Sequence, residues 1–168
     1  LKCKIVRVNT NLDHKIFHKI KNEYFLSKTN KENLLFTLSI LKKFKIKKDL
    51  LFRSLKEFKG LKYRQQIIFR NSKMTIINDS KSTSFSSSLG ILKTRVNVYW
   101  ILGGIFKKGD KFNLPKKYHN KIKAFIFGKN KKFFNNQLKG KIEYENFTNI
   151  KDAFEKTLIV SKIQKSIH

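Results

Sequence analysis

Residues 96–104 read Val-Asn-Val-Tyr-Trp-Ile-Leu-Gly-Gly, a mostly apolar run that ends on two glycines. A short run rich in β-branched and aromatic residues is typical of a strand buried on both faces, and such strands occur mainly in parallel sheets. Segments typical of strands and of helices then alternate along the chain. We therefore expect an α/β fold in which a mostly parallel sheet has helices on both faces.

The segments after this strand fit that expectation. Short strands are predicted over 124–127 and 142–144, and helices over 116–120, 130–138 and 149–161. In the last helix the spacing of apolar residues predicts an inward face made of Ala153, Phe154, Thr157, Leu158 and Val160.

The first third of the chain has a different pattern. A strand over 4–8 and a helix over 13–22 are predicted first, and Cys3 is expected to be a small buried hydrophobe. Asn30 is a good N-cap for a leucine-rich helix that extends to Phe44. Asp49 is expected to cap a second helix, which Gly60 ends.

Beyond Gly60 the pattern changes to that of a β-hairpin. Strands are expected over 65–69 and 74–77, joined by the polar turn 70–73, and a helix ending near Lys93 follows a polar segment.

Composition sets limits on the class of protein. Sixteen Phe and 40% hydrophobic residues supply a core, so wholesale disorder is excluded. No apolar run is long enough to span a membrane, and no signal segment opens the chain. One cysteine excludes an intramolecular disulfide and fits the cytoplasm.

The charge is high: 39 Lys+Arg against 11 Asp+Glu give a formal net charge of +28. Such a balance favours nucleic-acid binding, so a basic nucleic-acid-binding α/β module is one alternative. However, 34 of the 39 are Lys and only 5 are Arg, and the lysines are spread over the whole chain. We therefore attribute most of the charge to a compositional bias and expect neither a nucleic-acid nor a membrane partner.

Ligands of open α/β sheets bind at the carboxyl ends of strands. At the first predicted end, Asp79, Ser80, Lys81 and Thr83 lie between a strand and a helix. Unpaired N–H groups at the helix start would favour a carboxylate or phosphate, to which Lys81 adds charge and Thr83 a hydroxyl. The alternative is that Ser82 or Thr83 only caps the helix.

The second strand end is Leu102-Gly103-Gly104, where a backbone could approach a ligand closely, with Lys107 and Lys108 beyond it. The chain has no dinucleotide fingerprint and no phosphate loop. His14 and His18 are four residues apart but have no Glu between them, so we expect a surface position and no metal site.

Four segments together resemble the Mur ligases, and specifically the ligases that add D-glutamate. They are 30–33 (Asn-Lys-Glu-Asn), 60–64 (Gly-Leu-Lys-Tyr-Arg), 77–84 (Ile-Asn-Asp-Ser-Lys-Ser-Thr-Ser) and 102–107 (Leu-Gly-Gly-Ile-Phe-Lys). The family patterns are H-N-x-x-N, G-L-P-H-R, I-N-D-S-K-A-T-N and L-G-G-x-x-K. The chain departs from them at Thr29, Lys62, Tyr63, Ser82 and Ser84.

The resemblance implies two domains: residues 1–59 as the helical end of the central ATP-binding domain, and 60–168 as a Rossmann-like C-terminal domain that stops before its last segment. It implies a monomer that forms an amide between UDP-N-acetylmuramoyl-L-alanine and D-glutamate through an acyl phosphate, with ATP and Mg²⁺, in peptidoglycan synthesis. Another Mur-type or folylpolyglutamate-type ligase is the alternative enzyme.

The resemblance also implies roles for individual residues. Lys81, Thr83 and Lys107 would hold the carboxylates of D-glutamate. Asn30, Asn33, Arg64 and Asp79 would contact ATP. The family's phosphate loop, metal-binding residues and UDP-binding domain have no counterpart in these 168 residues. We therefore expect the chain to be part of a longer enzyme, to have no catalytic or metal-binding residue of its own, and to be inactive alone.

Overall fold

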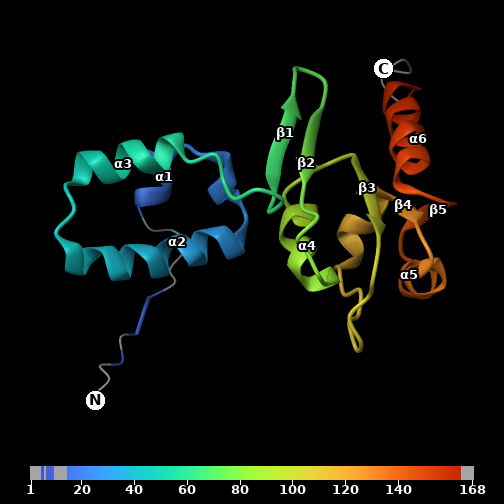
Figure 1. Ribbon diagram of the computed structural model, residues 1–168, viewed down its shortest axis with the longest axis horizontal. Coiled ribbons are helices and arrows are strands. Elements are labelled where there is room, and N and C mark those ends of the chain that lie inside the picture. Colours follow the sequence, from blue (N-terminus) through green and yellow to red (C-terminus); the bar gives the residue numbers. More distant parts are fainter. Residues whose placement is uncertain (1–4, 6, 10–14, 164–168) are drawn as a thin grey trace. The chain divides into compact units, whose positions relative to one another are not determined.

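The structure is a computed structural model that describes residues 5, 7–9 and 15–163 (Figure 1). The chain divides into two compact units after Lys81, and each is considered by itself. Of the strand predicted over 4–8, the described residues 5, 7 and 8 have no regular secondary structure. Lys4, Val6, Cys3 and His14 lie outside the described residues.

The first unit begins with helices. They are α1 (Ile16–Ile20), the 3₁₀ helix η1 (Glu23–Leu26), α2 (Lys28–Leu41), the 3₁₀ helix η2 (Lys42–Phe44) and α3 (Lys48–Glu57). Ile16, Ile20, Phe25 and Leu34 form their buried core. The helix predicted over 13–22 corresponds to the shorter α1.

Both predicted N-caps of these helices are wrong. Ser27 caps α2, and its hydroxyl accepts the N–H of Asn30 at 3.3 Å. Asn30 lies inside the first turn because its own amide points inward and bonds elsewhere. In α3 the N-cap is Lys47, and Asp49 lies in the first turn, where its charge favours the positive end of the helix dipole.

The predicted hairpin is confirmed. Strands β1 (Gln66–Arg70) and β2 (Thr75–Asn78) pair antiparallel. The Asn71 side chain accepts the N–H groups of Lys73 and Met74, which fixes the turn. Glu23 of η1 pairs with Arg70 of β1, with one contact of 2.6 Å.

This pair joins the hairpin to the helices within one compact unit that extends to Lys81. The division into two family domains after residue 59 stays a prediction.

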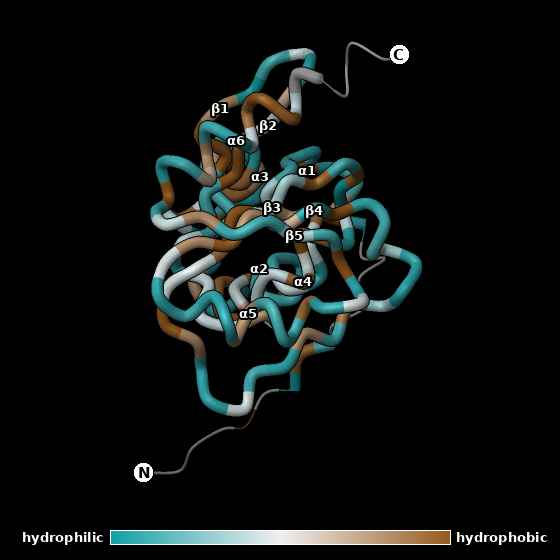
Figure 2. Tube along the Cα trace, turned by 90° about the vertical axis from the view of Figure 1, so that its right-hand side faces the viewer, coloured by the Kyte–Doolittle hydropathy of each residue, from teal (hydrophilic) through white to brown (hydrophobic). Residues whose placement is uncertain are grey.

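The second unit has the expected α/β architecture. Strands β3 (Val98–Gly103), β4 (Ile122–Phe127) and β5 (Glu143–Phe147) form a parallel sheet in the order β3-β4-β5. Figure 2 shows the hydrophobic character of β3 and β4. The helices are α4 (Phe85–Lys93), the 3₁₀ helix η3 (Lys116–Lys121), α5 (Lys131–Leu138) and α6 (Ile150–Ile163).

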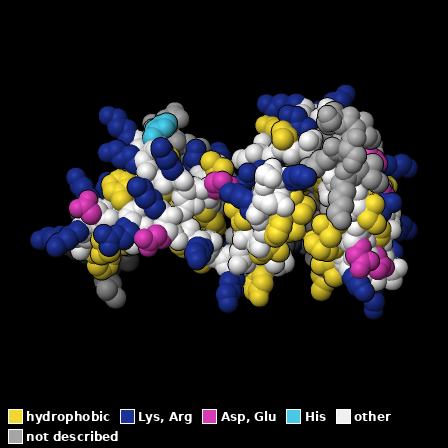
Figure 3. All heavy atoms as spheres, turned by 90° about the horizontal axis from the view of Figure 1, so that it is seen from above, with side chains coloured by type: hydrophobic (Ala, Val, Ile, Leu, Met, Phe, Trp, Pro, Cys, Tyr) yellow, Lys and Arg dark blue, Asp and Glu magenta, His cyan; other side chains and the backbone are white. Residues whose placement is uncertain are grey.

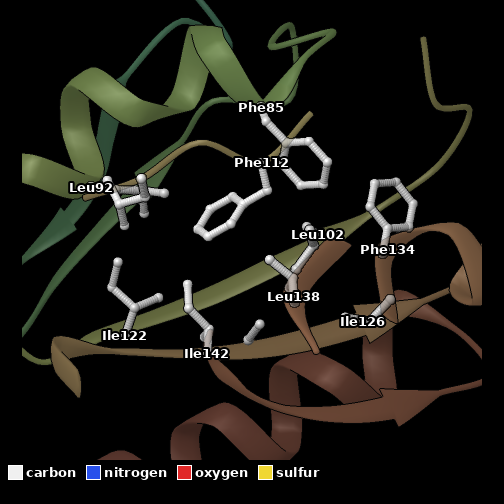
Figure 4. Packing of buried hydrophobic residues seen from close by; sticks show 11 residues of the cluster. Phe85, Leu92, Leu102, Phe112, Ile122, Ile126, Phe134, Leu138 and Ile142 are labelled. Atoms are coloured by element: carbon white, nitrogen blue, oxygen red, sulfur yellow. The ribbon is translucent and has the colours of Figure 1, made fainter. Parts of the chain in front are cut away.

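The two faces of this sheet bury different helices. Ile122, Ala124 and Ile126 of β4 belong to a cluster with residues of α4 and α5. In Figure 4, side chains of that cluster point toward one another from α4, α5 and the strands: Phe85, Leu92, Phe134, Leu138 and Leu102. Phe125, fully buried, alternates with these positions and so faces the other way.

Helix α6 packs against β3 and β4, and its Ala153 and Thr157 are buried, as predicted. Phe154, also predicted to face inward, is 38% exposed. One position along a helix rotates a side chain by about 100°, so Phe154 cannot share the face of Ala153. Among the described residues, no helix combines the length and apolarity needed to cross a membrane.

Candidate functional site

Strand β3 ends on Gly103, and Gly104 begins the loop that follows; the two positions require glycine for different structural reasons. A Cβ on Gly103 would lie 2.5 Å from the carbonyl oxygen of Phe127, its partner in the parallel register. Gly104 has φ +96°, which L side chains rarely adopt, and its surroundings are open. Gly103 is therefore explained by the close approach of a neighbouring strand, where the sequence suggested approach to a ligand.

Asp110 joins this loop to the start of α4. Its Oδ2 accepts the backbone N–H of Phe85 at 2.7 Å, and its own N–H donates to the carbonyl of Lys107 at 3.0 Å. The loop that contains Lys107 is thereby fastened to the helix start that follows Thr83. Sequence reasoning missed Asp110, because nothing in the pattern relates residue 110 to residue 85.

The start of α4 is already capped by groups of the chain. Ser84 is the N-cap, and Ser84 and Ser87 form a reciprocal capping box. The alternative, in which Ser82 or Thr83 caps the helix, is wrong: the Ser82 hydroxyl instead bonds Ser87 and Ser88 at 2.6 and 2.8 Å.

The expected unpaired N–H groups are accordingly satisfied at Phe85 and Ser87. The carboxylate that the helix end attracts is the chain's own Asp110.

The first predicted strand end differs in topology from the second. β2 belongs to the separate two-stranded antiparallel sheet, so of the two predicted strand ends only that of β3 lies at the parallel sheet. The segment after β2 is nevertheless ordered by the chain: Asn78 accepts the N–H of Ser80, and the N–H of Lys81 donates to the carbonyl of Tyr63, both at 3.0 Å.

Asn30, Arg64 and Asp79, three of the four residues expected at ATP, are brought together around Gln65 and Tyr24. The Asp79 carboxylate accepts the N–H of Gln65 at 3.0 Å. The Asn30 amide donates to Gln65 Oε1 at 3.1 Å and to the carbonyl of Tyr24 at 2.7 Å. Asn33, one turn further along α2, is exposed.

The electrostatics of Tyr24 also reflect this cluster. Burial raises the pKa of the Tyr24 phenol, the positive charge of Arg64 lowers it, and the Asp79 carboxylate raises it. Gln65 and Tyr24 were missed by sequence reasoning. The only available signal was that Gln65 directly follows the Gly60–Arg64 segment.

The three residues expected at D-glutamate are all exposed: Lys81, Thr83 and Lys107. Thr83 and Lys107 are connected within the second unit through Phe85 and Asp110. Lys81 ends the first unit, two positions before Thr83 in the chain. Two shallow pockets of about 370 and 480 Å³ lie elsewhere, lined by residues between 17 and 31 and between 116 and 143 respectively, and no predicted site residue lines either one.

The part of the chain that the structure describes holds no cluster of metal-ligating side chains. No group of three or more His, Cys, Asp or Glu side chains there could hold a metal ion, so we assign no Mg²⁺ ligand among the described residues. Figure 3 shows Lys and Arg side chains scattered over the visible face. On this face the distribution fits the spread of lysines along the sequence, which favours compositional bias over a groove that follows a nucleic-acid backbone.

Comparison with known proteins gives a consistent set of relatives, although no family model matches the chain. The chain is 30% identical to the UDP-N-acetylmuramoylalanine–D-glutamate ligase of Wolbachia sp. subsp. Brugia malayi (strain TRS) and 31% identical to that of Wolbachia pipientis wMel, each over 126 residues. It is 32% identical over 130 residues to the ligase of the same name from Francisella tularensis subsp. tularensis (strain SCHU S4 / Schu 4).

Each match covers 75% of this chain, and the share of the relative is 25% for the two Wolbachia ligases and 31% for the Francisella ligase. The chain thus spans between a quarter and a third of the length of these curated relatives, an extent consistent with the C-terminal part of such a ligase. The resemblance inferred from the four segments is confirmed: over three quarters of its length, the chain is a homologue of the D-glutamate-adding Mur ligases.

Proposed function

We propose that this chain is part of an ATP-dependent ligase that joins D-glutamate to UDP-N-acetylmuramoyl-L-alanine in peptidoglycan synthesis. The observation that carries the proposal is the 30–32% identity to ligases that are named for D-glutamate. Of the two segments expected at the substrates, 102–107 matches its family pattern throughout, and 77–84 departs from its pattern at Ser82 and Ser84. In the structure the chain's own hydrogen bonds order both.

The proposed chemistry has two steps. The γ-phosphoryl group of ATP passes to the carboxylate of UDP-N-acetylmuramoyl-L-alanine, which gives an acyl phosphate and ADP. The amine of D-glutamate then attacks the acyl carbon, an amide bond forms, and inorganic phosphate leaves. Mg²⁺ would neutralise charge on the phosphates, with ligands that we do not place in this chain.

The chain's contribution is binding and orientation. Lys81 and Lys107 supply the positive charges that a dicarboxylate amino acid needs, and Thr83 supplies a hydroxyl donor. Arg64 would pair with the phosphates of ATP, and Asp79 would accept hydrogen bonds from the ribose. Asn30 and Asn33 would lie near the adenine. In this proposal the enzyme acts as a monomer in the cytoplasm.

A hybrid ligase tests the proposal directly. The matched segment of the Wolbachia pipientis ligase is replaced by this chain, and ADP release is measured with ATP, UDP-N-acetylmuramoyl-L-alanine and D-glutamate. We expect release that requires both substrates. The chain alone, and the relative with its matched segment deleted, are the inactive controls.

The choice of amino acid separates the two enzyme alternatives. L-glutamate, L-alanine and diaminopimelate are offered in place of D-glutamate. ADP release that is specific for D-glutamate supports the proposal. Equal or greater release with another amino acid would instead indicate another Mur-type or folylpolyglutamate-type ligase.

A further inference from the structure

We propose that Asp110 is a positioning residue for D-glutamate: its carboxylate fixes Lys107 beside the start of α4. This inference rests on the proposed function, because it concerns the substrate contacts of that site. Asp110 itself touches no substrate in the proposal and acts through the backbone of two other segments.

Two of the residues predicted to contact D-glutamate, Thr83 and Lys107, belong to the second unit. Asp110 forms hydrogen bonds next to the first and to the second. Its Oδ2 is 2.7 Å from the N–H nitrogen of Phe85, two residues after Thr83. Its N–H is 3.0 Å from the carbonyl oxygen of Lys107. Gly109, at φ +80°, supplies the left-handed residue of the turn between them.

Other contacts hold the loop, but none of them reaches α4 through a hydrogen bond. On one side of Lys107, Asn130 donates to the carbonyl of Gly104 at 2.8 Å, and the ring of Phe106 stacks on Phe133 at 4.1 Å. On the other side, the N–H of Phe112 donates to Gln137 at 3.0 Å. These contacts hold the loop against α5. Toward the start of α4, Asp110 supplies the hydrogen bond, and the ring of Phe112 packs on that of Phe85 with 5.5 Å between centroids.

A carboxylate suits this position for an electrostatic reason. The N-terminus of a helix has a partial positive charge, and a hydrogen bond from its N–H to an ionised acceptor is stronger than a neutral one. An Asn side chain has the same shape and keeps an acceptor oxygen, so it should preserve most of the contact. An Ala side chain has no acceptor, so the loop would lose its hydrogen bond to α4 and keep only the ring contact of Phe112 with Phe85.

The test measures substrate constants in the hybrid ligase for three variants. For Asp110→Ala we expect the KM for D-glutamate to rise about tenfold or more, because small displacements of a substrate contact are costly, while the KM for ATP stays unchanged. Asp110→Asn should stay close to wild type. Asp152→Ala is the matched control, because it removes a first-turn carboxylate from α6 of the same unit; it should leave both constants unchanged.

A second readout needs no activity. In an ¹⁵N-labelled sample of the 168-residue chain, Asp110→Ala should move the amide resonance of Phe85 and raise its hydrogen-exchange rate, and Asp152→Ala should do neither. An unchanged Phe85 amide would overturn the contact itself.

The possible results are distinct. A wild-type hybrid that does not use D-glutamate overturns the proposed function, and the Phe85 amide then still reports on the contact. An active hybrid in which Asp110→Ala leaves the KM for D-glutamate unchanged, or lowers it, overturns the positioning role. If Asp110→Ala raises the KM for ATP as well as that for D-glutamate, or if Asp152→Ala raises the KM for D-glutamate equally, the positioning role is overturned. Asp110 would then contribute to the stability of the fold alone.

Discussion

The side-chain amide of Asn30 donates a hydrogen bond to Oε1 of Gln65, 35 residues further along the chain, at 3.1 Å. The same amide donates to the carbonyl of Tyr24 at 2.7 Å. A buried side chain of α2 thus connects η1 to the segment before the hairpin. Asn30 is also expected to contact ATP. Its hydrogen bonds within the chain can be tested by stability measurements, which need no active enzyme.

Replacing Asn30 with Ala should destabilise the chain by about 1–3 kcal/mol, because two acceptors lose their shared donor. Asn33→Ala is the control from the same helix: Asn33 is exposed, and its loss should cost about 0.5 kcal/mol or less. Urea denaturation followed by circular dichroism measures both free energies of unfolding. Equal values for the two variants would contradict the bonded role of Asn30.

Gly103→Ala should destabilise the second unit through a steric clash. Its new Cβ would meet the carbonyl oxygen of Phe127 at 2.5 Å and the ring at 2.8 Å, and overpacking of this kind costs about 1–3 kcal/mol. Gly104→Ala meets no atom within 4 Å and is strained only through its φ of +96°. Thermal unfolding should therefore show the lower Tm for Gly103→Ala, and the reverse order would contradict the observed strand register.

Because of Lys123 of β4, the free energy of unfolding of the second unit should decrease as the pH rises through the alkaline range. Hydrogen bonds to Glu143 and Glu145 of β5, the latter at 2.8 Å, raise the pKa of Lys123 above its ordinary value. A raised pKa in the folded state stabilises the fold below the unfolded pKa of about 10.4, and this contribution is lost as the pH rises through the folded pKa.

The measurement is the difference in free energy of unfolding between wild type and Lys123→Met at several pH values. Because Glu143 is largely exposed, we expect about 0.5–1 kcal/mol at pH 7 to 9.5 and a decline above about pH 10.5. Lys121→Met, a change at a neighbouring exposed lysine, is the control. A Lys123 difference that does not vary with pH would rule out the ion pairs as its source.

Lys107 and Lys108 form a matched pair for testing the proposed D-glutamate contact. Both are exposed neighbours in the same loop, but only Lys107 corresponds to the lysine of the L-G-G-x-x-K pattern. In the hybrid ligase, Lys107→Ala should raise the KM for D-glutamate at least tenfold, the cost of about one charge-assisted contact. Lys108→Ala should leave it unchanged, and similar effects of the two changes would exclude a specific role for Lys107.

The sequence pattern predicted correctly those helices and strands whose conformation depends mainly on their own residues and close neighbours in the chain. The hairpin, the parallel strand that ends at Gly103 and helices α4 to α6 lie close to their predicted ranges, because apolar periodicity and turn residues are local signals. The N-cap of α2 is Ser27 and not the predicted Asn30, and the N-cap of α4 is Ser84, beyond both residues of the alternative reading, Ser82 and Thr83. The side chain of an N-cap accepts an N–H of the first helical turn. In α2 the Ser27 hydroxyl does so, whereas the Asn30 amide donates to Tyr24 and Gln65.

The sequence by itself determined the fold class, the relationship to the D-glutamate-adding Mur ligases and which residues are candidates for the substrates. The tertiary structure decided how those candidates are held. Gln65 brings Asn30 near Asp79, and Asp110 fastens the Lys107 loop to the start of α4. Contacts across 14 to 35 residues of chain depend on how separate elements pack, and no local pattern encodes them.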